Sequence, residues 1–461
     1  MSAKSIVSPG TSLEQIRAAL HEAPLVAIRQ ELTDQRILDA CAGCGHDWRE
    51  RLYGPVVTVL HFVAQALQRE ESFAATWQEL WAPVAAAFPE LDPDRLDTSA
   101  LTHARGRLPK EVLQSLAEEA CARSVQHAAP TWKGLRLKAL DCSTVSMPRE
   151  KELFDHFGAH RARSTPVRYP LATCACLLEV GSSLALGYRF GPFDPGEMRT
   201  AGPLLQMLGP GDLVLTDRHF AGAPQLHAIR ATGAHFLMRK NARLIVERLP
   251  VMERLGYRDF ITEIPVSNQV RRNHPGMPPT VRVRIFRATW KSPDGRKLTD
   301  WFVTSLEDAQ RFKPRTLAKL YHQRWRSETS YLEFKQTFHA DVLRSKTVAN
   351  IEKEFAAHVL AYQLVRLLMA QAARKHRKKP TEISTLNAAR WLLSFSHLMA
   401  AAPAAKLPAL YGRLLDLIAS SEIDVRPGRL EPRTLTREWK HYPHLRICRP
   451  MWRYQQLQTG S

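Results

Sequence analysis

The sequence predicts a mixed α/β protein with three parts: an all-α N-terminal domain, an α/β core, and a β-rich subdomain inserted into that core. Three observations support this prediction. Apolar residues recur at helical spacing through most of residues 1–130. From about residue 133 the pattern changes to alternating or continuous apolar runs of strand length. Between about 245 and 305, short β-like runs are separated by segments rich in proline and glycine.

The helical part begins with a capping-box pattern at 11–15, where Thr and Ser precede Glu and Gln. Apolar residues at helical spacing predict another helix over 56–68 and a helical pair over 98–123, broken at Pro109. The pair contains a basic segment at 103–107. A compact helical module with basic turns is consistent with a DNA reader of the helix-turn-helix type, and a purely structural packing domain explains the composition equally well.

The core is predicted to follow the order β-β-β-α-β-α-β. Its first strand, 134–141, alternates apolar and basic residues, and the run 212–217 is almost continuously apolar, as in strands buried on both faces. Asp141 ends the strand 134–141, and Asp217 ends the strand 212–217. Such residues point into the crevice where open α/β sheets place their sites, although a single aspartate there is more often a cap or a turn residue. Further strands are expected at 171–180, 183–190 and 234–240, and helices at 196–208 and 221–232.

The same changes of pattern predict the domain boundaries. The insertion contains β-like runs at 260–266, 280–290 and 299–306, and two helices follow at 315–339 and 351–379. The predicted parts are the helical N-terminal domain 1–130, the first part of the core 131–242, the inserted β-rich subdomain 243–306, the second part of the core 307–400, and a basic C-terminal region 401–461.

Charge indicates the class of partner. The 461 residues include 65 Lys and Arg against 45 Asp and Glu, a net charge of +20, which favours nucleic acid over a membrane surface. The most apolar stretch, 355–373, contains His358, Gln363 and Arg366, so a core helix is expected there and not a membrane span. The N-terminal segment has no apolar signal core, and seven scattered cysteines fit reduced thiols. A cytoplasmic protein is therefore expected.

A further functional element begins at Tyr321. On one helix, Tyr321, Arg324, Glu328 and Lys335 would share a face, because they are separated by three, four and seven residues. Such a stripe is unusual for a surface that faces the core. If only the spacing is considered, however, the stripe is better explained as a solvated helix face. On such a face Arg324 and Glu328 would form a helix ion pair worth about 0.3–0.5 kcal/mol.

Taken together, these blocks resemble a known family. The sequence resembles bacterial insertion-sequence DDE transposases, of the group whose ribonuclease H-like core carries a β-strand insertion before its last carboxylate. The hallmark of that group is Tyr, two residues, Arg, three residues, Glu, six residues and Lys, and Tyr321, Arg324, Glu328 and Lys335 match it in full. The resemblance is strong over 133–375 and looser before residue 130. Other similar blocks are LDCSTVSMP (140–148), GDLVLTDRHF (211–220), FLMRK (236–240), FVTSL (302–306), LRSKT (343–347) and HVLAYQLVR (358–366).

The resemblance implies that Asp141, Asp217 and Glu328 form a catalytic triad that binds two Mg²⁺ ions, with Mn²⁺ as a substitute. Asp141 would bridge both ions, and Asp217 and Glu328 would each hold one. This agrees with physical chemistry, because Mg²⁺ prefers oxygen ligands. Two ions about 3.5–4 Å apart can stabilise the attacking and leaving oxygens of an in-line displacement at a phosphodiester. No side chain is then needed as a covalent nucleophile.

The resemblance also implies residues that contact DNA near the cut. Arg324 suits a forked contact with a phosphate, and Lys335 supplies a point charge. Trp301 resembles the tryptophan that hairpin-forming relatives insert into DNA, where it stacks on a flipped base. Packing in the core explains Trp301 equally well. The full set of expected DNA-binding residues is Tyr321, Arg324, Lys335, Arg218, Arg239, Lys240 and Trp301.

These inferences predict a metal-dependent cut-and-paste transposase. It would bind the terminal inverted repeats of an insertion sequence, cleave at the ends and transfer the 3′ ends to target DNA. Its partners would be double-stranded DNA and a second copy of the chain in a synaptic homodimer, in the bacterial cytoplasm at the nucleoid. Residues 1–130 would read the ends, and 401–461 would assist pairing or contact DNA. The alternatives are a nuclease without strand transfer and a catalytically inactive DNA-binding regulator, which should have lost a carboxylate.

Overall fold

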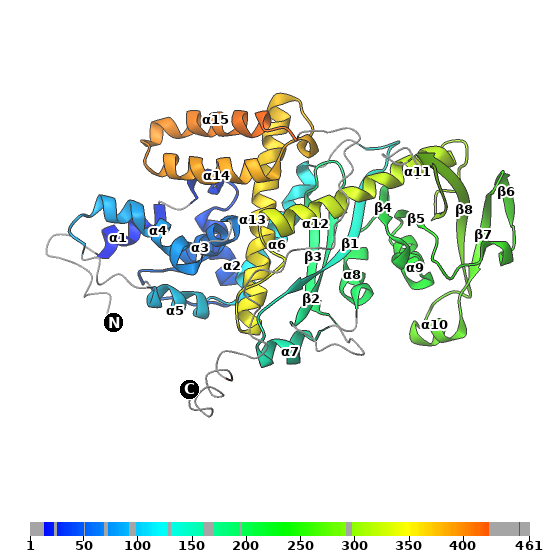
Figure 1. Ribbon diagram of the computed structural model, residues 1–461, viewed down its shortest axis with the longest axis horizontal. Helices are drawn as coiled ribbons and strands as arrows, with labels where there is room; N and C mark the ends of the chain where they lie inside the picture. Colours follow the sequence, from blue (N-terminus) through cyan, green and yellow to red (C-terminus); the bar gives the residue numbers. More distant parts are fainter. Residues whose placement is uncertain are drawn as a thin grey trace, which may run out of the picture.

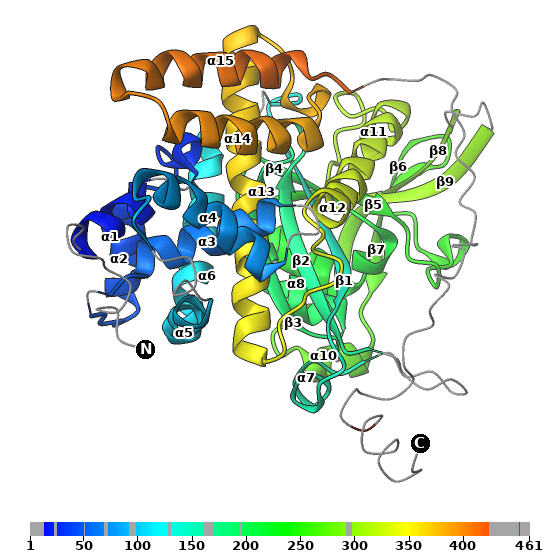
Figure 2. The same cartoon turned by 60° about the vertical axis from the view of Figure 1, so that its left-hand side comes forward.

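A computed structural model describes most of the chain and places a bundle of helices beside a large twisted sheet, with the long helix α13 (Val348–His376) between them (Figure 1). Both views show α13 in this position (Figure 2). The described residues are 13–22, 25–49, 51–68, 72–91, 98–127, 131–159, 169–193, 196–291, 297–423 and 451.

The described residues before 128 form helices and no strand. The predicted helix 56–68 and the helical pair over 98–123 are confirmed, with the break of the pair at Leu108 and Pro109. The capping box expected at 11–15 falls partly outside the described residues. The helices are α1 (Leu13–Glu22), η2 (Val26–Ile28), α2 (Asp34–Gly43), α3 (Pro55–Leu67), α4 (Phe73–Ala87), α5 (Ser99–Arg107), α6 (Lys110–Arg123) and η4 (Ser124–His127).

The strands form one nine-stranded sheet in the order β3-β2-β1-β4-β5-β9-β8-β7-β6. Strands β1, β4 and β5 run parallel, and the other neighbouring pairs are antiparallel. All five residues of β4 are buried, as its continuous apolar sequence predicts. The strands are β1 (Arg136–Ser146), β2 (Leu171–Glu179), β3 (Ala185–Pro192), β4 (Asp212–Thr216), β5 (His235–Arg239), β6 (Glu253–Gly256), β7 (Asp259–Pro265), β8 (Thr280–Lys291) and β9 (Lys297–Thr304).

The predicted order of core elements is confirmed, with one addition. The short helix α7 (Lys151–Phe157) lies between β1 and β2, and α8 (Glu197–Leu205) and α9 (Ala223–Ala231) connect the strands that follow. The strands of the insertion continue the sheet of the core, because β9 pairs with β5 through Leu237 and Thr304. The apolar pattern along the chain indicates strands but not which strand edges meet. The short elements of this region are η5 (Arg218–Phe220), η6 (Val246–Arg248) and α10 (Asn268–Asn273).

The prediction of a single helix over 315–339 is wrong in one respect. A tight turn, η7 (His322–Arg324), divides it into α11 (Pro314–Tyr321) and α12 (Trp325–Thr337). The two halves pack on different surfaces, since α11 contacts β8 and β5 whereas α12 contacts β1. The ring of His322 packs edge-on against Trp290 at 5.0 Å, which fixes the turn against the sheet. The remaining helices are η8 (Pro380–Glu382), α14 (Thr385–Ala400), η9 (Ala404–Lys406) and α15 (Leu407–Ser420).

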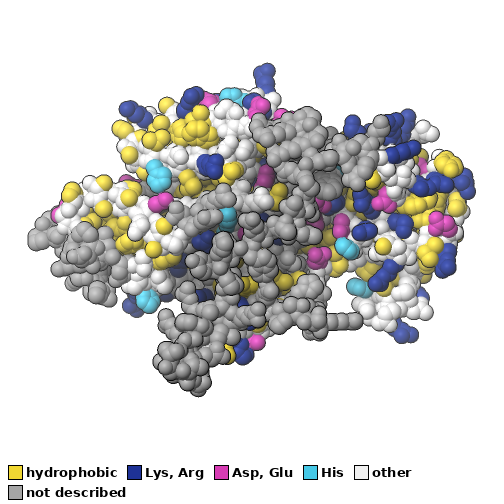
Figure 3. All heavy atoms as spheres, in the orientation of Figure 1, with side chains coloured by type: hydrophobic (Ala, Val, Ile, Leu, Met, Phe, Trp, Pro, Cys, Tyr) yellow, Lys and Arg dark blue, Asp and Glu magenta, His cyan; other side chains and the backbone are white. Residues whose placement is uncertain are grey.

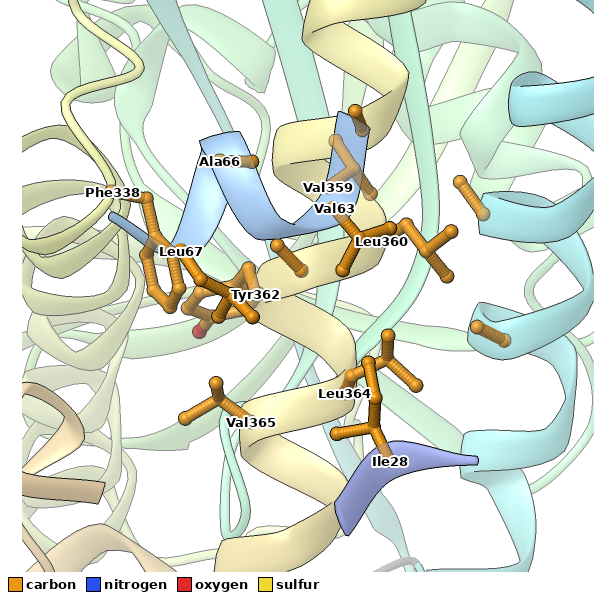
Figure 4. Packing of buried hydrophobic residues seen from close by; sticks show 14 of the residues in the cluster. Ile28, Val63, Ala66, Leu67, Phe338, Val359, Leu360, Tyr362, Leu364 and Val365 are labelled. Atoms are coloured by element: carbon orange, nitrogen blue, oxygen red, sulfur yellow. The ribbon is translucent and has the colours of Figure 1, made fainter. Parts of the chain in front are cut away.

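Helix α13 joins the two halves of the molecule. Its side chains Val359 and Leu360 pack against Val63 of α3, and Tyr362 packs near Phe338 (Figure 4). On the sheet side, the amide of Gln363 bonds to the backbone of Ala185 in β3. The expectation of a core helix over 355–373 is thus confirmed. Among the described residues, no helix is long and apolar enough to span a bilayer.

Candidate active site

Two of the three predicted carboxylates lie level with each other, one within β1 and the other directly after β4. β1 and β4 are parallel, and Ala139 pairs with Leu215. Asp141 and Asp217 each lie two residues further along, so the register places them side by side on strands about 4.8 Å apart. Alternate residues of a strand share a face, so both carboxylates lie on the face of Ala139 and Leu215, the one that packs against Tyr321.

Asp141 lies within its strand and not at its end, contrary to the prediction. β1 continues to Ser146 by pairing with β2, whereas β4 ends just before Asp217. The side chain of Asp141 is therefore 17 % exposed at the point where its neighbouring strand stops. Pairing with β2 could not be read from the apolar pattern of 134–141.

Local hydrogen bonds orient both aspartates. The backbone N–H of Cys142 donates to Oδ1 of Asp141 at 2.9 Å, and the hydroxyl of Tyr331 donates to the Asp141 carbonyl at 2.7 Å. Oδ1 of Asp217 accepts from the backbone N–H of His219 at 2.8 Å, and Nδ1 of the same histidine lies 2.9 Å from Oδ2. His219 and Tyr331 were missed in the sequence. Their positions, two residues after Asp217 and three after Glu328, are the signals that could have indicated them.

The third carboxylate is joined to the first by Arg324. Its two terminal nitrogens lie 3.5 Å from Oδ2 of Asp141 and 2.6 Å from Oε1 of Glu328. One guanidinium therefore spans both acids, and its side chain is only 12 % exposed. Burial acts to lower the pKa of Arg324, but Tyr321, Glu328 and Asp141 outweigh it and the pKa is raised. The helix ion pair expected from spacing is present, as part of a three-residue cluster.

Tyr321 is a buried residue that lies next to Arg324 of this cluster. It is 2 % exposed, and its ring meets Phe302 edge-on at 5.3 Å. The guanidinium carbons of Arg239 and Arg324 lie 5.7 and 5.8 Å from the centre of the ring. Burial raises the pKa of Tyr321, although both arginines oppose this effect. Tyr321 thus positions two cations, and a direct contact with DNA stays a prediction.

Three other predicted DNA-binding residues lie at or just after the carboxyl ends of β4 and β5. Arg218 follows Asp217 directly and is exposed. Arg239 pairs with Asp300 at 3.3 Å, and Lys240 donates to the Leu244 carbonyl at 3.0 Å.

Lys335 lies on α12, whereas Trp301 packs on the face of the sheet opposite to the one that carries the acidic cluster. Burial raises the pKa of Cys174 on β2 to about 12, and the nearby positive charge of Lys335 opposes that rise. Trp301 on β9 is partly buried and meets Phe260 edge-on at 6.5 Å. Packing accounts for one face of this indole, and its insertion into DNA is untested.

The donor set suits a hard divalent cation. Asp141, Asp217 and Glu328 provide carboxylate oxygens, which are the ligands that Mg²⁺ prefers. Within the described ranges no group of three or more His, Cys, Asp or Glu is arranged to hold an ion. Arg324 stands between Asp141 and Glu328, so these two carboxylates can share a cation only after the guanidinium has released them.

Comparison with known proteins identifies the family. Residues 132–364, half of the chain, match the family described as "Transposase DDE domain". This chain belongs to the DDE transposases. The matched residues of this transposase include Asp141, Asp217, Glu328 and the insertion, which confirms the resemblance inferred from the sequence motifs. DDE transposase domains generally use divalent metal ions.

A curated relative extends the match to nearly the whole chain. The transposase is 27 % identical over 431 residues to "Transposase InsG for insertion sequence element IS4" of Escherichia coli strain K12, covering 91 % of this chain and 93 % of the relative. Among solved structures it is similar to the piggyBac transposase synaptic complex with hairpin DNA, with a TM-score of 0.43, 13 % identity, and 86 % and 85 % of the two chains covered.

Proposed function

We propose that this transposase binds the terminal inverted repeats of an insertion sequence, cleaves at both ends and transfers the 3′ ends to target DNA by cut and paste. The observation that supports this proposal most directly is the cluster of acids on one face of the sheet. Asp141 in β1 is level with Asp217, which directly follows the neighbouring strand β4, and a single guanidinium joins Asp141 to Glu328.

The architecture supports the assignment. The strand order β3-β2-β1-β4-β5, with β1, β4 and β5 parallel, is consistent with a ribonuclease H-like core that β6–β9 extend. The helices before residue 128 form the DNA-binding domain that reads the ends, and residues 401–461 assist pairing. Lysine and arginine side chains gather at the end of the molecule formed by β6–β8, where Arg254, Arg258 and Arg287 are exposed (Figure 3). Such a basic surface suits DNA.

Asp141, Asp217 and Glu328 would hold two Mg²⁺ ions, or Mn²⁺ in their place. When bound, the ions stabilise charge on the attacking and leaving oxygens at the phosphodiester. His219 orients the carboxylate of Asp217, and Tyr331 fixes the backbone at Asp141.

The cationic side chains bind the DNA strand. Once Asp141 and Glu328 bind cations, the guanidinium of Arg324 binds a phosphate of the DNA through two parallel hydrogen bonds. Arg218, Arg239, Lys240 and Lys335 neutralise neighbouring phosphates. Trp301 stacks on a base at the end of the element. Two copies of the chain pair the two ends.

Cleavage and strand transfer test the proposal. With Mg²⁺, the wild type is expected to cut DNA that contains the element ends and to join pre-cut ends to a plasmid. Glu328→Gln should bind the same DNA and reduce both reactions at least about 100-fold, because it removes one of the carboxylates proposed to hold the cations that stabilise the transition state. Asp155→Asn, which changes a carboxylate that is 61 % exposed on α7, is the matched control and should keep full activity.

The alternatives give different results. A nuclease without strand transfer would cut the ends and leave pre-cut ends unjoined. A DNA-binding regulator would bind the ends, and neither the wild type nor Glu328→Gln would cut them.

A further inference from the structure

A second basic site lies in the helical part of the molecule, apart from the acidic cluster. A cavity of about 190 Å³ opens between the α2–α3 connection and the carboxyl end of α5. Trp48, Arg49 and Arg51 line it from the connection, and Arg107 lines it from α5. These four residues are called the basic pocket below.

The arginines of the basic pocket are available for a ligand. Arg49, Arg51 and Arg107 are exposed, and within the described part of the chain none of them has an ion pair or a hydrogen bond. Asp47 is the one carboxylate among the described residues that line the cavity. The pocket therefore carries more positive charge than its own lining neutralises.

Two of these arginines lie close enough to repel each other. The pKa of Arg107 is lowered, first by partial burial and then by the positive charge of Arg51. Neighbouring like charges repel each other, and an anion placed between them reduces this repulsion.

The carboxyl end of α5 is held rigidly. Nζ of Lys353 on α13 donates to the carbonyls of Arg105 and Gly106 at 2.9 and 3.2 Å. Arg105 itself turns inward and bonds to Gln65 at 2.6 Å. Of the basic segment predicted at 103–107, Arg105 is thus a structural residue, whereas Arg107 faces the pocket.

The chemistry of the lining identifies the ligand class. Forked guanidinium groups match the oxygens of a phosphate. The indole of Trp48 is 40 % exposed and lies beside His46, with 6.3 Å between the ring centres, so it offers an apolar wall for a sugar. A phosphate attached to a deoxyribose satisfies both features, whereas a free anion satisfies only the first.

We propose that the basic pocket binds one phosphate of the DNA backbone, with Trp48 against the sugar of the same nucleotide. This rests on the proposed function in one respect, that the chain binds DNA. A backbone contact fixes the position of the helical part on the duplex and carries no sequence information of its own.

The test uses the full-length protein and two duplexes, one with an element end and one of unrelated sequence. Affinity is measured by fluorescence anisotropy over a series of KCl concentrations. The variant Arg51→Ala/Arg107→Ala should bind both duplexes about 10-fold more weakly in 0.1 M KCl. Its slope of log affinity against log salt should be shallower by about 0.9 for each phosphate lost. Arg51→Lys/Arg107→Lys, which keeps the charge, should retain the slope.

The matched control is Arg315→Ala/Arg390→Ala. These arginines are exposed on α11 and α14, which lie above α5 in Figures 1 and 2. The control variant should change the affinity less than twofold, and circular dichroism should show that all variants are folded. The proposal is overturned if the pocket variant binds as the wild type does, or if the control loses as much affinity.

Three further outcomes separate the sources of the phosphate and the two proposals. If calorimetry shows that inorganic phosphate binds the wild type and not the pocket variant, while the DNA slope is unchanged, the pocket takes a free anion and the proposal fails. If the wild type binds DNA through the pocket but cuts no DNA, the pocket stands and the catalytic proposal fails. If the wild type binds no DNA, both fail.

Discussion

Arg324 links two acids that a cation would otherwise link. Its guanidinium contacts both Asp141 and Glu328, and Tyr321 lies against it. Without this arginine the two carboxylates would repel each other across a partly buried site. At the scale of single residues, Arg324 therefore both stabilises the acidic cluster and competes with any cation that enters it.

Arg324→Ala is expected to separate these two roles. Mn²⁺ should bind the variant several-fold more tightly than it binds the wild type, since the competing charge has gone. Cleavage should fall about 100-fold, because the same side chain is proposed to bind the phosphate. Mn²⁺ binding is measured by electron paramagnetic resonance and cleavage on end-containing DNA. Unchanged Mn²⁺ affinity would show that Arg324 does not occupy the cation position.

The lowered pKa of buried His61 makes the free energy of unfolding depend on pH. His61 is 1 % exposed in α3, and burial followed by the charge of Arg105 lowers its pKa to about 3. The unfolded chain, with a histidine pKa of about 6.5, binds the proton more readily than the folded chain. Stability should therefore fall as the pH drops below about 6.5, and this loss continues to about pH 3.

The measurement is urea unfolding at pH 7.5 and 5.5. Over this interval the His61 contribution to the free energy of unfolding should fall by about 1.4 kcal/mol. His61→Gln should lose that much less than the wild type between the two pH values. Equal losses would mean that other groups cause the acid sensitivity.

At the scale of elements, α12 is the helix that carries Glu328, and an ion pair with a buried arginine and a partly buried glutamate holds it in place. Glu333 of α12 pairs with Arg366 of α13, whose side chain is 3 % exposed and also bonds to Tyr362. This pair lies one turn beyond Glu328, so it fixes the helix against the central helix of the molecule.

Replacing one residue of the Glu333–Arg366 pair should lower the free energy of unfolding more than replacing both residues. Arg366→Met leaves a carboxylate without its counter-ion and is expected to lower the free energy of unfolding by about 3–5 kcal/mol. Glu333→Gln/Arg366→Met should recover part of that loss. Denaturant unfolding of the two single variants and the double variant measures the coupling. Additive effects would contradict an energetically coupled pair.

The fold at this scale was largely predictable from local patterns. The runs at 56–68 and 212–217 carry their own periodicity, so a helix and a buried strand follow from them directly. The turn at His322 was not predictable, because it depends on the contact with Trp290, a residue of the distant strand β8.

At the scale of the whole molecule, the inserted strands β6–β9 and the core strands form one continuous sheet, so the insertion is structurally part of the core. Arg284 on β8 is fully buried and pairs with Asp259 on β7 at 2.6 Å. It also donates to the carbonyls of Leu306 and Phe312, in the segment that leads to α11. This one side chain ties the inserted strands to the helices that carry the candidate active site.

Arg284→Met should therefore affect regions on both sides of the junction. The variant is expected to lose about 3–5 kcal/mol of stability and to raise amide exchange in both β7 and α11. Arg287→Met, an exposed position on the same strand, is the control and should leave exchange unchanged. Faster exchange confined to β7 would show that the insertion unfolds independently.

The sequence by itself determined the order of most elements and the family, because apolar periodicity and motif spacing are properties of the local chain. Only the tertiary structure decided that Asp141 lies within a strand and beside Asp217, since strand pairing joins residues far apart in sequence. It also decided that Tyr321 is buried, that Arg324 bridges two acids, and that Arg107 and Arg51 line one cavity. Contacts between distant segments set burial and charge environment, and no local pattern encodes them.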